Sequence, residues 1–168
     1  MTVSTAARLI GGLLAACFAV AAQAQSASAT LAPTAGNTAA GTVSFTQNGD
    51  KVTVSAKVSG LAPGGHGFHI HEKGDCSAPD GMSAGGHFNP TGKPHGAPDA
   101  ADHHAGDMPM LQADASGNAM LTADLGIPGG VSGIVGKAVI VHKDPDDYKT
   151  QPTGNSGARV ACGVIAKS

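Results

Sequence analysis

Short stretches of alternating apolar and polar residues, separated by turns rich in glycine and proline, constrain the fold of this chain most strongly. Residues 42–46 and 51–58 alternate in this way, and the Asn48-Gly49-Asp50 turn between them predicts a β-hairpin. Further strand candidates cover residues 67–71, 110–113, 118–125, 137–142 and 159–166. Because no stretch has a helical period, we expect an all-β fold, either an antiparallel sandwich or a barrel.

Composition limits the size of the core and the class of partner. The 168 residues include 25 Gly and 8 His but only 4 Phe, 1 Tyr and no Trp, so one modest core and a single folded domain are expected. The formal net charge of −2 argues against a general nucleic-acid binder, which would carry a basic stripe. Eight histidines in a chain with so few large side chains suggest that metal contributes to the structure.

The N-terminus has the pattern of a secretory signal peptide over residues 1–24. Arg8 precedes an apolar stretch over residues 9–22, and Ala22-Gln23-Ala24 fits an A-x-A cleavage site. Residues 14–17 also resemble a lipobox, which would instead leave Cys17 as a lipidated N-terminus. No later segment reaches membrane-spanning length, so no transmembrane segment is expected.

After cleavage the folded chain would begin with a polar lead-in and would retain two cysteines. Residues 25–38 are rich in Ala, Ser and Thr, and we interpret them as a flexible lead-in with room for one short strand. The remaining cysteines are Cys76 and Cys162, and an oxidising compartment favours a disulfide between them over free thiols.

Residues 76–107 do not fit the strand pattern. This stretch holds six Gly, four Pro and four His, and so long a loop inside a compact domain is expected only where it is functional or tied down. Three of its histidines and one aspartate form an N3O set that suits a closed tetrahedral zinc site: His87, His95, His104 and Asp107. Any one of them alone could be a solvated loop residue.

A second histidine group lies on predicted strands. His69 and His71 are two residues apart, so both imidazoles project from one face, about 6–7 Å apart. His142 ends the apolar strand candidate over residues 137–142 and would lie at a sheet edge. Imidazole is a good ligand for copper and zinc, although His-x-His alone is as compatible with a surface pair.

Four motifs together resemble the copper–zinc superoxide dismutases, of the bacterial exported type. They occur in order over residues 67–72 (GFHIHE), 85–90 (GGHFNP), 104–107 (HAGD) and 154–165 (GNSGARVACGVI), and the resemblance spans about residues 39–167. It implies a dismutase domain over residues 39–168, folded as an eight-stranded Greek-key β-barrel (a flattened sandwich) with two long functional loops. It also implies a periplasmic location.

The resemblance also implies the site residues. Copper would be bound by His69, His71, His87 and His142, and zinc by His87, His95, His104 and Asp107, with one copper and one zinc per chain. His87 would bridge the two metals and carry a proton, and Arg159 would guide superoxide, a small anion, to copper. Asp146 matches a carboxylate that orients one ligand of each metal, with Asp147 as the neighbouring alternative. Cys76 would pair with Cys162.

The implied reaction converts superoxide to molecular oxygen and hydrogen peroxide as antioxidant defence outside the cytoplasm. The alternative is a non-enzymatic periplasmic protein that carries copper or stores zinc on the same barrel. The loop over residues 143–158 is shorter than in well-known members and lacks their acidic pair, so Lys143 or Lys149 could supply positive potential there. His103 is an extra histidine, expected to be solvated, and His66 matches a histidine with a structural role. A monomer and a homodimer both fit the sequence.

Overall fold

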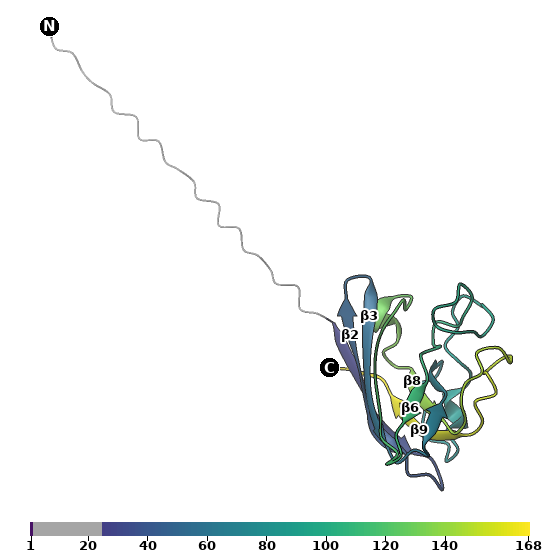
Figure 1. Cartoon of the computed structure of the whole chain (residues 1–168). Coiled ribbons are helices and arrows are strands. Elements are labelled where there is room, and N and C mark those ends of the chain that lie inside the picture. The colour runs from purple at the N-terminus through teal and green to yellow at the C-terminus, as the bar shows by residue number, and fades with distance from the viewer. Residues whose placement is uncertain (2–24) are drawn as a thin grey trace.

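The computed structural model describes Met1 and residues 25–168 (Figure 1). Residues 2–24, with almost all of the predicted signal peptide and the alternative lipidation site at Cys17, lie outside the described residues. Within the described part, no helix is long and apolar enough to cross a membrane. That part consists of strands, two short 3-10 helices and connecting loops.

The regular structure consists mainly of antiparallel strands. Each of the seven strand candidates from the sequence overlaps a strand of the structure. The described strands are β1 (Ser26–Pro33), β2 (Ala40–Asn48), β3 (Lys51–Ser59), β4 (Gly64–His66), β5 (Phe68–His71), β6 (Leu111–Ala113), β7 (Ala119–Leu125), β8 (Ala138–His142), β9 (Arg159–Val164) and β10 (Ala166–Lys167). The 3-10 helices are η1 (Met82–Ala84) and η2 (Gly130–Gly133).

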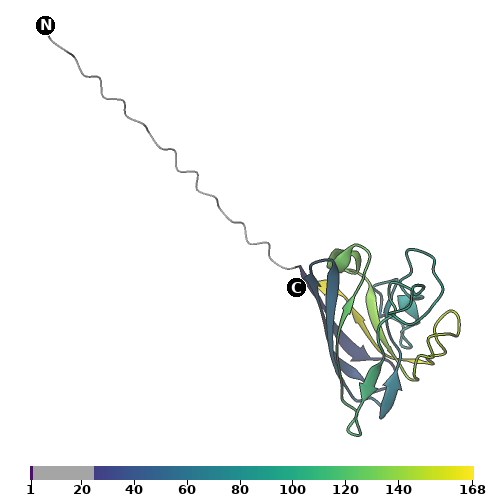
Figure 2. The ribbon, with the colours of Figure 1, turned by 45° about the horizontal axis from the view of Figure 1, so that its top comes forward.

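Strand pairing closes the sheet into a barrel. Neighbouring strands follow the order β4-β6-β7-β3-β2-β1-β9-β8-β5, and β10 pairs with β1. The two ends of this path, β4 and β5, are separated in sequence only by Gly67, so one continuous segment completes the ring (Figure 2). If β4–β5 and β9–β10 are each counted as one interrupted strand, the barrel has the eight strands that the sequence predicted. The β1–β9 and β3–β7 pairs join strands that are not consecutive in sequence, as in a Greek key.

The expectation of a flexible lead-in over residues 25–38 is wrong for most of that stretch. Residues 26–31 pair with β2 along their whole length, and residues 32 and 33 pair with β9. Ala27, Ala29 and Leu31 point into the core and are almost fully buried. The alternation was visible in the sequence, but alanine and serine have weak strand propensity, so burial against β2 and β9 decides the conformation.

Small β-branched and aliphatic side chains fill the barrel interior. The residues of β3 at every second position, Val52, Val54, Ala56 and Val58, are buried, while the residues between them are more exposed. Phe45 and Phe68 are the largest of the fully buried side chains. Close packing of valine and alanine therefore replaces the aromatic volume that this composition lacks.

Strands β5 and β8 are buried on both faces because loops cover their outer side. Val139 and Val141 of β8 face the barrel interior, whereas Ala138 and Ile140 pack outside it in a second cluster with Ala84 and Cys162. The long loops, residues 72–110 and 143–158, project from the same side of the barrel (Figure 1). This outer layer contains the candidate site.

Candidate metal centre

Strand β5 presents two histidines to the outer layer. Phe68 and Ile70 belong to the interior core, so the alternation of the strand places His69 and His71 on the opposite face. Neither imidazole is exposed to solvent, and their ring centroids lie 6.3 Å apart. The predicted spacing of 6–7 Å is confirmed.

The long loop runs beside β5 through backbone hydrogen bonds, which brings its histidines to the strand. The N–H of Phe88 donates to the Ile70 carbonyl (2.8 Å), and the N–H of Ile70 donates to the Gly106 carbonyl (2.9 Å). A side chain at Gly106 would collide with the backbone carbonyl of Ile70. Glycine is therefore required at Gly106 for the close approach of loop and strand.

The first cluster consists of four buried histidines whose ligand atoms lie within 4.8 Å of one another: His69, His71, His87 and His142. The Nε2 atoms of His71 and His142 are 3.4 Å apart, and the rings of His69 and His87 are separated by 4.0 Å between centroids. The last residue of β8, the two histidines of β5 and one loop histidine thus converge on one point. These are the four residues predicted for copper.

The second cluster shares His87 with the first and holds the four residues predicted for zinc: His87, His95, His104 and Asp107. The Asp107 carboxylate lies at its centre, with Oδ1 2.8 Å from Nδ1 of His87 and Oδ2 3.0 Å from Nδ1 of His95. Backbone N–H groups of Gly96 and His104 also donate to Oδ2 of Asp107. They fix the carboxylate among the three imidazoles.

Three buried ring nitrogens make no well-directed hydrogen bond in the described part of the chain: Nδ1 of His69, Nε2 of His87, and Nδ1 of His95, which lies 3.0 Å from Oδ2 of Asp107. Buried polar atoms are almost always paired, so such atoms call for an explanation. All three belong to the two clusters, and imidazole nitrogen is a preferred ligand of both copper and zinc. The residues present therefore fit a pair of metal ions joined by His87.

Asp146 connects the two clusters by hydrogen bonds to one histidine of each. Its Oδ2 accepts a hydrogen bond from Nε2 of His69 (2.6 Å), and its Oδ1 accepts one from Nε2 of His95 (2.9 Å). The carboxylate thereby orients one histidine of each cluster, so that the Nδ1 atom of each ring is the one directed away from Asp146. Asp147, the alternative from the sequence, is exposed and instead accepts hydrogen bonds from Lys149 and Thr150.

The clusters strongly perturb the titration of their members. Burial is the main cause that lowers the pKa of His69 to about 4 and that of His142 to about 3. Burial alone would lower the pKa of His95, but hydrogen bonds and charge from Asp107 and Asp146 raise it to about 9. Burial alone would raise the pKa of both carboxyls, and hydrogen bonds from the histidines lower it instead.

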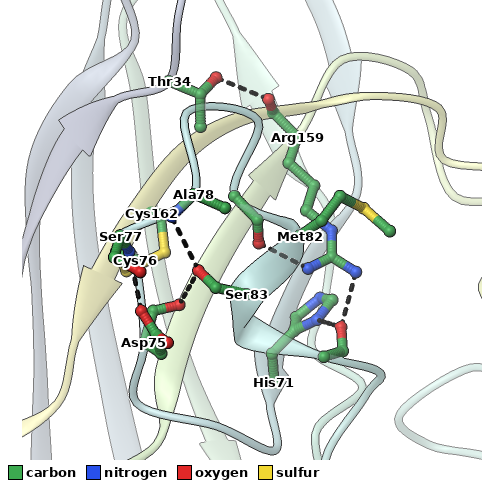
Figure 3. Close-up of a disulfide and its surroundings, with 12 residues drawn as sticks. Thr34, His71, Asp75, Cys76, Ser77, Ala78, Met82, Ser83, Arg159 and Cys162 are labelled. Carbon is green, nitrogen blue, oxygen red and sulfur yellow. Dashed lines mark hydrogen bonds between the residues drawn. A yellow bond between two sulfur atoms is a disulfide. The ribbon is translucent and has the colours of Figure 1, made fainter.

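Arg159 lies beside the first cluster on the wall of an open pocket. Its Nη1 and Nη2 atoms donate to the carbonyls of Gly81 (2.7 Å) and Gly85 (2.6 Å), on either side of η1 (Figure 3). The pocket has a volume of about 590 Å³, and His142 and Arg159 both line it. A small anion that enters the pocket therefore meets a guanidinium next to a histidine of the first cluster.

A disulfide fixes the loop that carries these carbonyls. Cys76 and Cys162 are bonded, with a Cα–Cα distance of 5.8 Å, as the sequence predicted (Figure 3). Because Cys162 lies three residues after Arg159 on β9, the bond holds the start of the loop next to the strand that bears the guanidinium.

Four other residues singled out in the sequence lie outside the two clusters. His66 is buried and places its ring nitrogens 2.8 Å from the carbonyl oxygens of Ala62 and His142, a structural role. His103 contacts the carbonyl of Ala100 and belongs to neither cluster. Lys143 and Lys149 do not line the pocket of Arg159; Lys143 lines a separate one.

Sequence reasoning missed two features of the site. One is the carbonyl of Gly85, which accepts hydrogen bonds from both Arg159 and His71 and which no side-chain pattern could reveal. The other is Asp80, which lines the same pocket as Arg159. Its position next to Pro79 and Gly81 signals a turn, but not the direction in which that turn faces.

Comparisons with known proteins agree with this geometry. The family model described as copper/zinc superoxide dismutase (SODC) matches residues 39–165. The chain is 49% identical over 134 residues to superoxide dismutase [Cu-Zn] 2 of Brassica juncea, which covers 74% of this chain and 88% of that protein. The crystal structure of the clock protein EA4 superimposes with a TM-score of 0.77 at 38% identity, covering 89% of this chain and 98% of the other. The chain belongs to the copper/zinc superoxide dismutase family.

Proposed function

We propose that this protein converts two superoxide anions and two protons to molecular oxygen and hydrogen peroxide. The first cluster would hold copper through His69, His71, His87 and His142, and the second would hold zinc through His87, His95, His104 and Asp107. The observation that carries the proposal is that His87 belongs to both clusters: its Nδ1 lies 2.8 Å from Asp107 of the second, and its Nε2 is buried without a hydrogen-bond partner. Copper supplies one-electron redox chemistry when bound, whereas zinc has none.

Three further roles belong to residues of the chain: attraction of the anion, orientation of the ligands and transfer of a proton. Arg159, held by two backbone carbonyls on the pocket wall, attracts the anion to the first cluster. The carboxylate of Asp146 keeps His69 and His95 in the orientation that metal binding needs. His87 belongs to both clusters and its Nε2 is buried without a hydrogen-bond partner, so this nitrogen is the atom at which a proton can be held and passed to the reduced substrate.

Metal content and activity of the purified protein test this proposal together. We expect one copper and one zinc per chain, with dismutation measured by pulse radiolysis or stopped flow. The variant His142→Ala should lose copper and activity while it retains zinc, because His142 belongs only to the first cluster. Zinc without copper or activity in the unaltered protein would favour the alternative, a non-enzymatic protein that binds or stores metal.

We further propose that the protein is a bacterial exported member of the family and acts in the periplasm. The signal-peptide pattern over residues 1–24 and the disulfide, which persists in oxidising compartments, support this assignment. Strand β1 begins at Ser26, so cleavage after Ala24 would leave the domain intact. Mass spectrometry of the mature N-terminus tests it: a chain that starts at Gln25 is expected, and a lipid on Cys17 would indicate membrane anchoring instead.

A further inference from the structure

Asp80 is fixed on the wall of the pocket that contains Arg159. Pro79 and Asp80 are the central residues of a turn closed by a hydrogen bond from the N–H of Gly81 to the Ala78 carbonyl (2.9 Å). Oδ1 of Asp80 accepts the N–H of Met82 (3.0 Å), which restrains the carboxylate. From the other side, the N–H of Ala35 donates to the Pro79 carbonyl (2.7 Å) and holds the turn against the β1–β2 connection.

Arg159 donates a hydrogen bond to the same turn. Asp80 directly precedes Gly81, whose carbonyl accepts the Nη1 hydrogen bond of Arg159. Burial lowers the pKa of Arg159, whereas the negative charge of Asp80 favours its protonated form. Among the ion pairs of the described residues, none joins a carboxylate oxygen to Arg159 within 4.0 Å. The two charges therefore act on each other at a distance, and both act on the pocket.

Of the described residues that line this pocket, Asp80 is the one acid and Arg159 the one arginine or lysine, and the one histidine, His142, belongs to the first cluster. The other lining side chains are small, polar or apolar, such as Thr34, Asn37 and Met82. An anion in the pocket is thus attracted by one fixed charge and repelled by another. Both energies grow in proportion to the charge of the anion.

We propose that Asp80 is a specificity-determining residue that lowers the preference of the pocket for multiply charged anions, such as sulfate and phosphate, relative to singly charged superoxide. This inference rests on the proposed function and deepens it. The guanidinium can form two parallel hydrogen bonds to an oxyanion, which would by itself favour sulfate and phosphate as ligands. The fixed charge of Asp80 opposes a dianion twice as strongly as a monoanion. The residual attraction admits superoxide and limits blockage by divalent oxyanions.

The variant Asp80→Asn tests this inference because the asparagine Oδ1 can still accept the N–H of Met82. Asp75→Asn is the matched control: Asp75 is exposed in the same loop and its Oδ1 accepts the N–H of Ser77 (2.8 Å), but it does not line the pocket. At low ionic strength we expect kcat/KM of Asp80→Asn for superoxide to rise about two- to fivefold. The increase should vanish near 1 M salt, where screening acts over about 3 Å.

Sulfate binding gives a second readout that does not depend on turnover. Sulfate is titrated at constant ionic strength, held with sodium chloride, and followed by the NMR signal of the Arg159 side-chain Nε–H in the reduced, diamagnetic protein. For Asp80→Asn the sulfate affinity should rise by about the square of the gain for superoxide, about four- to twenty-five-fold. Asp75→Asn should change neither quantity by more than a small fraction of these values.

Other outcomes would overturn the inference. They are an unchanged or lower rate for Asp80→Asn, a sulfate gain no larger than the superoxide gain, no sulfate binding to either protein, or an equal effect of Asp75→Asn. If the unaltered, metal-loaded protein does not convert superoxide, the proposed function fails. The sulfate titration then still decides whether Asp80 discriminates between anions at this pocket.

Discussion

Arg159 and His71 are joined through one backbone oxygen: the carbonyl of Gly85 accepts Nη2 of Arg159 at 2.6 Å and Nδ1 of His71 at 2.9 Å. The hydrogen bond on Nδ1 leaves Nε2 of His71 to face the first cluster. The same oxygen holds the guanidinium that attracts the anion. These two hydrogen bonds fix the position of the Arg159 guanidinium relative to His71. The carbonyl of Gly81 accepts a further hydrogen bond from Arg159.

Replacing Arg159 should separate attraction of substrate from metal binding. In Arg159→Ala we expect kcat/KM at low ionic strength to fall about tenfold and its salt dependence to flatten, because the fixed positive charge of the pocket is lost. Copper and zinc should remain bound, since Arg159 contributes to neither cluster. Arg159→Lys keeps the charge and should retain part of the salt dependence. An unchanged rate for Arg159→Ala at low salt would contradict the role of Arg159 in attraction.

The variant Asp146→Asn should bind both metals more weakly. An amide can serve only one of His69 and His95 as a hydrogen-bond acceptor, so one ligand of the pair loses its orientation. Losses of this kind typically cost 10–100-fold in metal affinity, about 1.4–2.8 kcal/mol. Competition with a chelator, monitored by elemental analysis, measures the change for each metal. Asp147→Asn is the control, since Asp147 touches neither histidine; an equal loss there would show that the loop, rather than the carboxylate of Asp146, is responsible.

Residue types and spacing identified two groups of candidate ligands, and the resemblance to the copper–zinc superoxide dismutases added His87 to the first group. The His-x-His spacing of β5 and the glycine-bracketed histidines of the loop predicted two clusters, and all seven candidate ligands converge in the structure. The choice between Asp146 and Asp147 needed coordinates. Only the backbone path, including the tight approach of Gly154 to Asp146, decides which carboxylate faces inward.

The fold was less predictable where side chains are small or where contacts are made by the main chain. Strand β1 looked like a lead-in because its buried side chains are mostly alanine, and one of its two partners, β9, is distant in sequence. No sequence pattern pointed to Tyr148. Its hydroxyl accepts a hydrogen bond from the N–H of Met110, and its own N–H donates to Asp146. Such couplings depend on tertiary packing and leave no periodic signal in the sequence.

Removing the metals should lower the melting temperature by about 10 °C or more. Metals that bind only the native state stabilise it by about 4 kcal/mol at a thousandfold excess over Kd, and a domain of this size shifts by about 2–4 °C per kcal/mol. Without them, Nδ1 of His69 and Nε2 of His87 lie buried with no compensating bond. Calorimetry of the metal-free and reconstituted protein measures the difference. A shift of only a degree or two would show that the barrel core and disulfide carry the stability alone.

Acidification should destabilise the metal-free protein, beginning near pH 6.5. His69 and His142 titrate at about 4 and about 3 when folded but near 6.5 when unfolded, so the unfolded state binds more protons as the pH falls through this window. The loss should be on the order of 3 kcal/mol for each by pH 4. Lowered pKa values of Asp107 and Asp146 act in the same direction at still lower pH.

His95 imposes the opposite trend on the alkaline side. Its pKa of about 9 means that the proton held between Asp107 and Asp146 stabilises the fold below pH 6.5 and is lost as the pH rises to 9. The metal-free protein should therefore be most stable near neutral pH. Urea unfolding between pH 4 and 9 measures the profile. The variant His69→Gln should flatten the acid limb, and a profile that does not depend on pH would contradict both assignments.

Removing the disulfide should cost stability and loosen the wall of the pocket. Cys76 and Cys162 are 86 residues apart, so the bond restricts a long loop of the unfolded chain; native disulfides of this kind contribute about 2–4 kcal/mol. In Cys76→Ala/Cys162→Ala the turn that bears Asp80 keeps only its hydrogen bonds to Arg159 and the β1–β2 connection. We expect a lower urea midpoint and faster amide exchange at residues 77–85, while β5 and β8 stay protected. Equal exchange in the two proteins would show that Arg159 and Ala35 suffice to hold the loop.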